Sequence, residues 1–250
     1  MHRRSDTLED GHAVNEKRIR RLMRLIGLMP IYQKPHTSKP AKGHKTCPYL
    51  LGGLRVERPN QVWCADITYL PMRKSYLYLV AVMDWFTRKV LAWRKSYTLK
   101  ADFCVEALNE SIHRFGPPEI MNTDQGSQFT SFAWSDRLKR IGTRISMDGK
   151  GRCLDNIFIE RLWRSLTYEC VYLDAWETGE QAKAGVGRWI TFYNRQRPHT
   201  AHGGQPPAVV YLKATQIDQQ VQEAAQITRK TVQGSGSSSV VLGKMPSLNK

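Results

Sequence analysis

Three acidic residues stand where their carboxylates could act together, namely Asp66, Asp124 and Glu160. Asp66 lies inside the apolar run CADITYL, whose strand-like alternation puts its side chain on the same face as Cys64. A carboxylate in such a run is costly unless it is paired or binds a metal ion. Asp124 ends a short apolar strand, and Glu160 lies beside the apolar stripe of a helical run. All three side chains can therefore project toward a common cleft.

Carboxylates of this kind suit phosphoryl transfer assisted by two divalent cations. Mg²⁺ prefers hard oxygen ligands and is usually held by a few carboxylates together with substrate phosphate. Two ions about 3.5–4 Å apart can activate the attacking oxygen and stabilise the leaving oxygen. The residues alone leave a second interpretation open. In it, Asp124 is a turn or cap residue, and Glu160 is an exposed helix carboxylate paired with Arg164.

The elements that must position these residues can be predicted from hydrophobic periodicity. Strands are predicted over 61–70, 76–83, 90–97, 119–122 and 143–147, and helices over 101–115, 131–141 and 156–172. The first three strands follow one another directly, as in an antiparallel meander, whereas the later strands alternate with helices. This order predicts an α/β fold, a mixed sheet with helices on its faces. Trp163 and Phe192 are predicted to lie in the core.

Positive charge is concentrated near the start of the chain. The 250 residues carry a net charge of +16, and residues 1–58 hold 13 Lys and Arg against 5 Asp and Glu. Within this region Asn15 can cap a helix that Gly27 can end. Its basic residues could contact DNA phosphates, or they could form an ordinary solvated face. The basic residues proposed for DNA contact are Lys17, Arg18, Arg21 and Arg24.

Composition excludes several other classes of protein. The longest apolar run, 76–83, is too short to span a membrane, and the first residues contain no apolar signal-peptide core. Five widely spaced cysteines fit neither a disulfide framework nor a thiolate zinc site, which indicates a reducing compartment. His36, His44 and Cys47 lack a nearby fourth ligand, so a basic linker explains them better than zinc does. We therefore expect a cytoplasmic protein that binds nucleic acid.

The spacing of the acidic residues and the sequence blocks around them resemble those of a known family. Thirty-five residues separate Asp124 from Glu160, as in the Asp, Asp, 35-residue gap, Glu signature of retroviral integrases and related insertion-sequence transposases. From about Asn15 to about Leu212 the chain is similar to the second-reading-frame transposases of one bacterial insertion-sequence family. The blocks that carry this resemblance are PNQVWCADITYL, NTDQGSQFTS, ISMDGKGRCLDNIFIERLWRSL and FYNRQRPHTAHGGQPP.

The resemblance implies a ribonuclease-H-like core with a two-metal active site. Asp66 would lie on its first strand and Asp124 at the end of its fourth, adjacent in the sheet, and Glu160 would come from a helix. Asp66 would contact both Mg²⁺ or Mn²⁺ ions, and the other two carboxylates would each hold one. Such an enzyme would nick DNA at the element's ends with water and then use the freed 3′-hydroxyl as the nucleophile in strand transfer.

The resemblance also implies a domain plan and a set of partners. Residues 1–33 would be a partial helix-turn-helix module and 34–56 a basic linker. Residues 57–214 would form the integrase-type catalytic core with its C-terminal helical extension, and 215–250 would be a flexible tail. Expected partners are double-stranded DNA, further copies of the chain and the upstream reading frame product, with no membrane contact.

Further DNA contacts are expected around the catalytic helix. Lys150 and Arg152 lie in a glycine-flanked loop that could grip DNA or simply be exposed. Asn156 could touch DNA, orient Glu160 or cap the helix, and Arg161 and Arg164 follow on the helix itself. Gly126 after Asp124 permits a close approach to phosphate, or an ordinary tight turn.

Two departures from the family pattern keep alternatives open. Thr167 stands where a Lys or Arg commonly follows the Glu by seven positions, although Arg161 and Arg164 could compensate. The chain also begins almost directly at the basic helix, so it is expected to be part of a longer working enzyme. The alternatives are a catalytically impaired DNA-binding remnant and a ribonuclease-H-like nuclease that cuts without joining. The block from Tyr193 to His199 has no chemical role that its residues explain.

Overall fold

The computed structural model describes residues 15–26, 47–73, 75–148, 156–174 and 176–234, in two units, Met1–Lys39 and Pro40–Lys250. In the first unit, helix α2 spans Glu16–Leu25. The Asn15 side chain accepts a hydrogen bond from the Lys17 backbone N–H at 2.9 Å, which confirms the predicted cap. Leu22 and Leu25 on this helix are exposed. Gly27, the expected helix end, lies outside the described residues.

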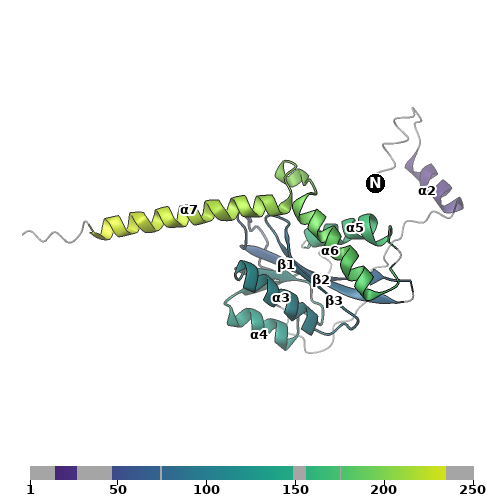
Figure 1. The fold of residues 1–250 in the computed structure, drawn as a ribbon, viewed down its shortest axis with the longest axis horizontal. Helices are drawn as coiled ribbons and strands as arrows, with labels where there is room; N and C mark the ends of the chain where they lie inside the picture. Colours follow the sequence, from purple (N-terminus) through teal and green to yellow (C-terminus); the bar gives the residue numbers. More distant parts are fainter. Residues whose placement is uncertain (1–14, 27–46, 74, 149–155, 175, 235–250) are drawn as a thin grey trace, which may run out of the picture. The chain divides into compact units, whose positions relative to one another are not determined.

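The second unit is built on a five-stranded mixed sheet with the order β3-β2-β1-β4-β5 (Figure 1). The antiparallel meander is confirmed by β1 (Val62–Pro71), β2 (Tyr76–Asp84) and β3 (Val90–Ser96). Strand β4 (Ile120–Thr123) pairs in parallel with β1, and β5 (Arg144–Met147) pairs in parallel with β4. Parallel neighbours need a crossover connection, and the intervening helices supply it. The predicted α/β mixed sheet is therefore confirmed.

Helices cover both faces of the sheet because the strands alternate apolar side chains between them. Helices α3 (Asp102–Phe115) and α4 (Phe132–Arg140) pack on the face that carries Trp63 and Val80. Helices α5 (Ile157–Leu166) and α6 (Gly179–Arg195) pack on the opposite face, with Cys64 and Met83 (Figure 1). Asp66 has the same strand parity as Cys64, so the face that carries it is the one under α5.

Helix α5 does not continue as a regular α-helix to residue 172. It passes into a π-helical turn, η1 (Thr167–Val171), which begins at the residue that departs from the family pattern. Single π-helical turns occur frequently at functional sites. Trp163 lies in the core as predicted, with 7% of its surface exposed, whereas the prediction for Phe192 is wrong, since 41% of its surface is exposed on α6.

The predicted linker over 34–56 is too long at its C-terminal end. Leu51 and Val56 pack with Val62 of the sheet, and the Leu50 backbone N–H donates to Ser146 Oγ at 3.0 Å. Apolar side chains among basic residues therefore attach the chain to the body from Cys47 onward. Residues 34–46 lie outside the described residues.

The expected flexible tail begins with helix. After a short 3₁₀ turn, η2 (Thr200–His202), helix α7 runs over Pro207–Gly234. Residues 208–233 contain neither proline nor glycine, which favours a continuous helix. Tyr211 near its start is buried and donates to Asn60 Oδ1 at 3.0 Å. Helix α7 thus crosses the boundary predicted at residue 215 and continues to Gly234, and 235–250 lie outside the described residues.

Across the described parts of the chain, no helix combines the length and the apolar character that crossing a membrane requires.

Candidate active site

Two of the three predicted carboxylates come together because their strands are neighbours. Strands β1 and β4 pair in parallel with Ala65 opposite Thr123, so the residues that follow, Asp66 and Asp124, lie side by side. Burial raises the pKa of Asp66 to about 7, and the neighbouring charge of Asp124 contributes to the rise. The predicted adjacency of these two residues is confirmed.

Glu160 reaches this pair through helix α5. The Trp163 indole N–H donates to Asp66 Oδ2 at 2.9 Å, which fixes this helix against β1. Residues three apart on a helix are neighbours, so Glu160 lies beside Trp163, and its charge also raises the pKa of Asp66. Burial raises the pKa of Glu160 itself. Among the described residues no ion pair joins Glu160 to Arg164, so the structure does not support their pairing.

Gly126 allows the Asp124 carboxylate to fold back on its own loop. The Gly126 backbone N–H donates to Asp124 Oδ1 at 3.0 Å, and a Cβ at position 126 would lie only 2.9 Å from that oxygen. Glycine at this position therefore allows the carboxylate to approach the backbone closely, while the approach to phosphate stays a prediction. Any larger residue would displace Asp124.

A fourth acidic residue, Asp148, lies at the same edge of the sheet. It follows β5, and its backbone N–H donates to the Thr123 carbonyl at 3.0 Å. Its Oδ1 accepts from Asn122 Nδ2 at 2.8 Å, and its carbonyl accepts from Gln125 Nε2 at 2.9 Å. Sequence reasoning missed this residue, although its position directly after the predicted strand 143–147 was a usable signal. Asp148 braces the loop that carries Asp124.

The donor set fits a hard divalent cation in its chemistry. Asp66 has two further carboxylates close enough to oppose its ionisation, and a bound cation would relieve that repulsion. Within the described residues, however, no three His, Cys, Asp or Glu side chains lie close enough to form a metal-binding group as they stand. The structure thus presents an aspartate pair with Glu160 alongside it on a helix.

Some of the basic residues predicted to contact DNA are on the surface. Arg161 and Arg164 are exposed on α5, next to Glu160. In the N-terminal unit Lys17, Arg18 and Arg21 are exposed on α2. These positions leave their charges available to phosphate.

The remaining predicted DNA contacts are not on a described surface. The Arg24 side chain and residues Lys150 and Arg152 lie outside what the structure describes. Asn156 is 6% exposed, and its side chain makes no capping hydrogen bond to α5. Its backbone carbonyl accepts from the Glu160 N–H at 3.2 Å, so Asn156 starts the helix, and its contact with DNA stays a prediction.

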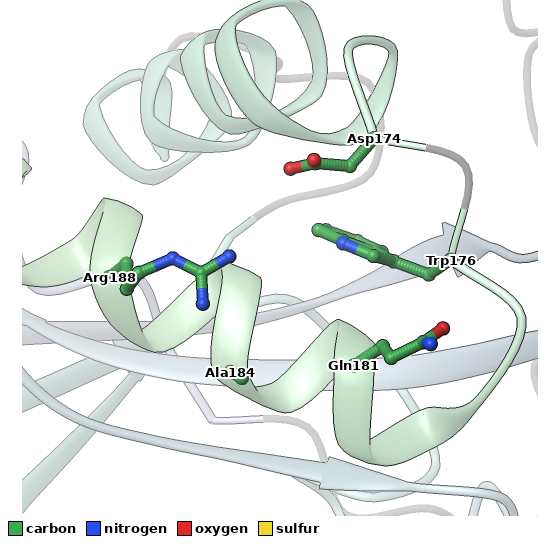
Figure 2. Close-up of a pocket in the computed structure, with 5 residues that line it drawn as sticks. All are labelled: Asp174, Trp176, Gln181, Ala184 and Arg188. Atoms are coloured by element: carbon green, nitrogen blue, oxygen red, sulfur yellow. The ribbon is translucent and has the colours of Figure 1, made fainter.

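A separate cavity of about 310 Å³ lies beside α6 (Figure 2). The buried Trp176 indole forms one wall, and the exposed side chains of Asp174 and Arg188 stand on either side. The residues that line it are Asp174, Trp176, Gln181, Ala184 and Arg188. None of the acidic trio is among them, so the candidate chemistry lies elsewhere.

Sequence relatives agree with the geometry of the site. Residues 56–153 match one integrase core domain model, and residues 141–207 match a second. Transposase InsF for insertion sequence IS3A, from Escherichia coli, is 38% identical over 152 residues, which cover 60% of this chain and 53% of InsF. The transposase for insertion sequence element IS904, from Lactococcus lactis, is 30% identical over 197 residues, which cover 76% of this chain and 78% of the relative. The chain spans about half the length of the E. coli relative.

Solved structures of low sequence identity share the fold. A chain of the simian T-cell lymphotropic virus intasome in complex with PP2A regulatory subunit B56 gamma is 16% identical, with a TM-score of 0.56 over 84% of this chain and 64% of that chain. The catalytic core domain of BIV integrase is 18% identical, with a TM-score of 0.51 over 64% of this chain and 98% of that chain. The sheet and its flanking helices are therefore of the ribonuclease-H-like type found in retroviral integrase cores.

Because two integrase core domain models match residues 56–207 and the IS904 transposase is 30% identical over most of both chains, this chain belongs to the bacterial insertion-sequence transposases with an integrase-type core.

Proposed function

We propose that this chain catalyses metal-dependent DNA strand cleavage and 3′-hydroxyl strand transfer during movement of an insertion sequence. The observation that carries the proposal is the placement of Asp66 and Asp124 on adjacent parallel strands, with Glu160 brought alongside by α5. Asp124 and Glu160 both oppose the ionisation of Asp66, and divalent cations held by a few carboxylates are the usual means of assisting phosphoryl transfer.

The acidic trio would hold two Mg²⁺ or Mn²⁺ ions. When bound, such ions lower the pKa of the attacking hydroxyl or water and stabilise the leaving oxygen. Trp163 keeps the Asp66 carboxylate in one orientation through its indole N–H, and Gly126 leaves room for the Asp124 carboxylate. Glu160 is exposed on α5, so it can approach the aspartate pair without unpacking the core.

DNA would be held by positive charge on both units. Each phosphate that a Lys or Arg neutralises releases counterions and adds sequence-independent affinity. Exposed Arg161 and Arg164 flank the acidic site, and the basic face of α2 would be part of a helix-turn-helix module. Two element ends must be joined to one target, so we expect more than one copy of the chain on the DNA, with the upstream reading frame product as a further partner.

The proposal is tested by cleavage and joining assays on the full chain, with duplex DNA taken from each flank of its coding region. Asp66→Asn, Asp124→Asn and Glu160→Gln should each reduce both reactions by roughly 100-fold or more, because several kcal/mol of charge stabilisation would be lost. Asp136→Asn is the matched control, since Asp136 lies on α4 and pairs with Arg140 at 2.8 Å. Retained DNA binding in all four variants would show that the chemistry alone was lost.

The same assays separate the alternatives. A chain that cleaves in Mg²⁺ but never joins a labelled 3′-hydroxyl end would be a nuclease of this fold. A chain that binds DNA without either reaction would be an impaired remnant, and Thr167→Lys would then test whether the departure at that position is the cause. Full activity in the Asp66→Asn variant would overturn the proposal.

A further inference from the structure

The segment from Tyr193 to His202 has no part in the site described so far, yet it is firmly built into the fold. The Asn194 side chain accepts from the Val90 backbone N–H and donates to the Val90 carbonyl, both at 2.9 Å. This pairing satisfies the backbone N–H and C=O of Val90, the first residue of edge strand β3. The segment is therefore anchored beside the turn that joins β2 to β3.

That turn presents Arg88 to helix α5. The buried Asp84 carboxylate organises the turn by accepting from Thr87 N at 2.8 Å, from Thr87 Oγ1 at 2.6 Å and from Asn60 N at 2.8 Å. Arg88 has a φ of 66°, in the left-handed region that residues other than glycine rarely adopt. A strained residue held by its surroundings in this way is commonly found where function needs it.

The Arg88 guanidinium and the Trp85 ring both contact Phe158. Arg88 Cζ lies 3.0 Å from the centroid of the Phe158 ring, and the Trp85 ring packs edge-on against the same ring at 4.9 Å. Phe158 is in the first turn of α5, two positions before Glu160. Both groups are half-buried, and cation–π contacts strengthen as the groups are removed from water.

Burying the Arg88 cation has a cost, which the nearby Asp84 carboxylate offsets only in part. Burial lowers the pKa of Arg88 to about 10, so the side chain stays charged near neutral pH. Its Nη1 atom is buried without a hydrogen-bond partner among the described residues. An apolar side chain of similar length would avoid both costs.

Two uncharged histidines lie near this charge, in addition to the buried Asp84 carboxylate of the turn itself. Burial and nearby cations, Arg197 and Arg88 among them, lower the pKa of His199 to about 4, and burial and Arg88 lower the pKa of His202. The Tyr193 ring packs edge-on against His199 at 4.9 Å. The Asp84 oxygens accept from Thr87 and Asn60, and the uncharged histidines add no further anion that would compete with Phe158 for the guanidinium.

The same segment also contacts the other end of α5. Arg197 pairs with Glu169 in the π-helical turn η1, and Trp189 Nε1 donates to the same carboxylate at 3.3 Å. Helix α5 is therefore held before Glu160 through Phe158 and after Trp163 through Glu169.

Holding both ends of α5 fixes its rotation, and rotation decides where Glu160 lies. At 3.6 residues per turn, Phe158 and Glu160 are about 200° apart around the helix. A side-chain head about 5–6 Å from the axis moves about 1 Å for each 10° of rotation. A misplacement of about 1 Å can cost about 100-fold in rate.

We propose that Arg88 is a positioning residue for Glu160, and that with the segment 193–202 it fixes the rotation of α5 and so the placement of Glu160 and Trp163 against Asp66. The part that concerns Glu160 rests on the proposed metal-dependent function. The part that concerns Trp163 does not, because its hydrogen bond to Asp66 is present without any ion.

The first test is hydrogen exchange of tryptophan indole N–H groups, followed by NMR in the metal-free full chain. Arg88→Met should speed exchange at Trp163 about tenfold and leave Trp134, buried on α4, unchanged. Arg114→Met is the matched control, since Arg114 lies over Phe115 at 5.2 Å on α3, and it should change neither. If Arg88→Met does not fold, Phe158→Leu replaces it. Unchanged exchange at Trp163, or equal acceleration at both tryptophans, would overturn the proposal.

The second test is a double-mutant cycle on Mn²⁺ affinity, measured by electron paramagnetic resonance. Arg88→Met should weaken binding about tenfold in the wild-type background and have no further effect in a Glu160→Gln background. An equal loss in both backgrounds would overturn the positioning role. If Glu160→Gln itself leaves Mn²⁺ affinity unchanged, the proposed function is at fault, and the exchange measurement still decides whether Arg88 positions α5.

Discussion

Replacing Trp163 with phenylalanine would isolate the hydrogen bond that joins the catalytic helix to Asp66. The indole N–H lies 2.9 Å from Asp66 Oδ2, and a hydrogen bond to an ionised group contributes about 1.5–3 kcal/mol. Loss of the second ring leaves a small cavity that costs about 1–2 kcal/mol more. We therefore expect Trp163→Phe to lower the free energy of unfolding by about 2.5–5 kcal/mol.

Trp134 provides a matched control within the same chain. It is fully buried on α4, and its Nε1 has no hydrogen-bond partner in the described part of the chain. Trp134→Phe removes the same atoms without breaking a hydrogen bond, and it also removes a buried N–H that has no partner, so it should cost at most the cavity term of about 1–2 kcal/mol. The two variants should therefore differ by at least about 1.5–3 kcal/mol, the contribution expected of the Trp163–Asp66 contact.

The measurement is urea unfolding followed by circular dichroism, at about pH 8.5 so that Asp66, with a pKa of about 7, is ionised. Trp163→Phe should also lower metal-dependent cleavage, since Asp66 loses the group that orients it. Equal destabilisation of the two variants, to within about 0.5 kcal/mol, would refute the hydrogen bond as an energetic link between α5 and Asp66.

Three further predictions follow from single contacts. Gly126→Ala should reduce DNA cleavage about 10- to 100-fold, because its Cβ would lie 2.9 Å from Asp124 Oδ1. Gly187→Ala on α6, where the nearest side-chain atom would lie 3.4 Å away, should leave cleavage unchanged, and equal rates in the two variants would contradict the steric argument. His199 has a folded pKa of about 4, below its ordinary value of 6.5, so the unfolded chain binds a proton that the folded chain excludes. The contribution of His199 to stability is complete above about pH 6.5 and is lost as the pH falls toward 4. His199→Gln should therefore flatten the dependence of the urea unfolding midpoint on pH over that range. An unchanged slope would show that His199 is not the group responsible. Arg18→Gln should lower the slope of log affinity for DNA against log salt by about 0.9 if Arg18 contacts one phosphate, and an identical slope would exclude that contact.

The strands and helices could be predicted because the spacing of apolar residues along the chain differs between the two. Alternating apolar residues located the strands, and the position of Asp66 within β1 and of Asp124 just after β4 followed directly. Their adjacency needed the order of strands in the sheet, which the family resemblance supplied and the parallel register of β1 and β4 confirms. The three candidate metal-binding carboxylates could thus be identified from sequence.

The contacts that orient those carboxylates were not accessible from sequence. Trp163 lies on an apolar stripe and was assigned to the core, since nothing local shows that its indole N–H meets Asp66, 97 residues earlier. Asn194 pairs with Val90 over a separation of 104 residues. The backbone of Arg88 adopts a conformation that propensity disfavours, and only the surrounding turn explains it.

The boundaries were wrong for a different reason. Composition assigned residues 47–56 to a basic linker, although a few apolar side chains such as Leu51 suffice to attach that stretch to the body. Fading sequence signal likewise placed a boundary at residue 215, whereas unbroken helix formers after Pro207 continue α7 to Gly234. The charge and low complexity of a segment indicate how well water solvates it, but they indicate less well whether the segment folds.

The central claim is that metal ions held by Asp66, Asp124 and Glu160 act on the scissile phosphodiester. The most direct measurement replaces the 3′-bridging oxygen at the cleaved position of the DNA with sulfur, and compares cleavage by the full chain in Mg²⁺ and in Mn²⁺. Sulfur is a poor ligand for Mg²⁺ and a better one for softer metals, so the account predicts that cleavage is lost in Mg²⁺ and restored in Mn²⁺. Equal cleavage of the sulfur-substituted DNA in both metals, or cleavage that persists in a chelator, would contradict it.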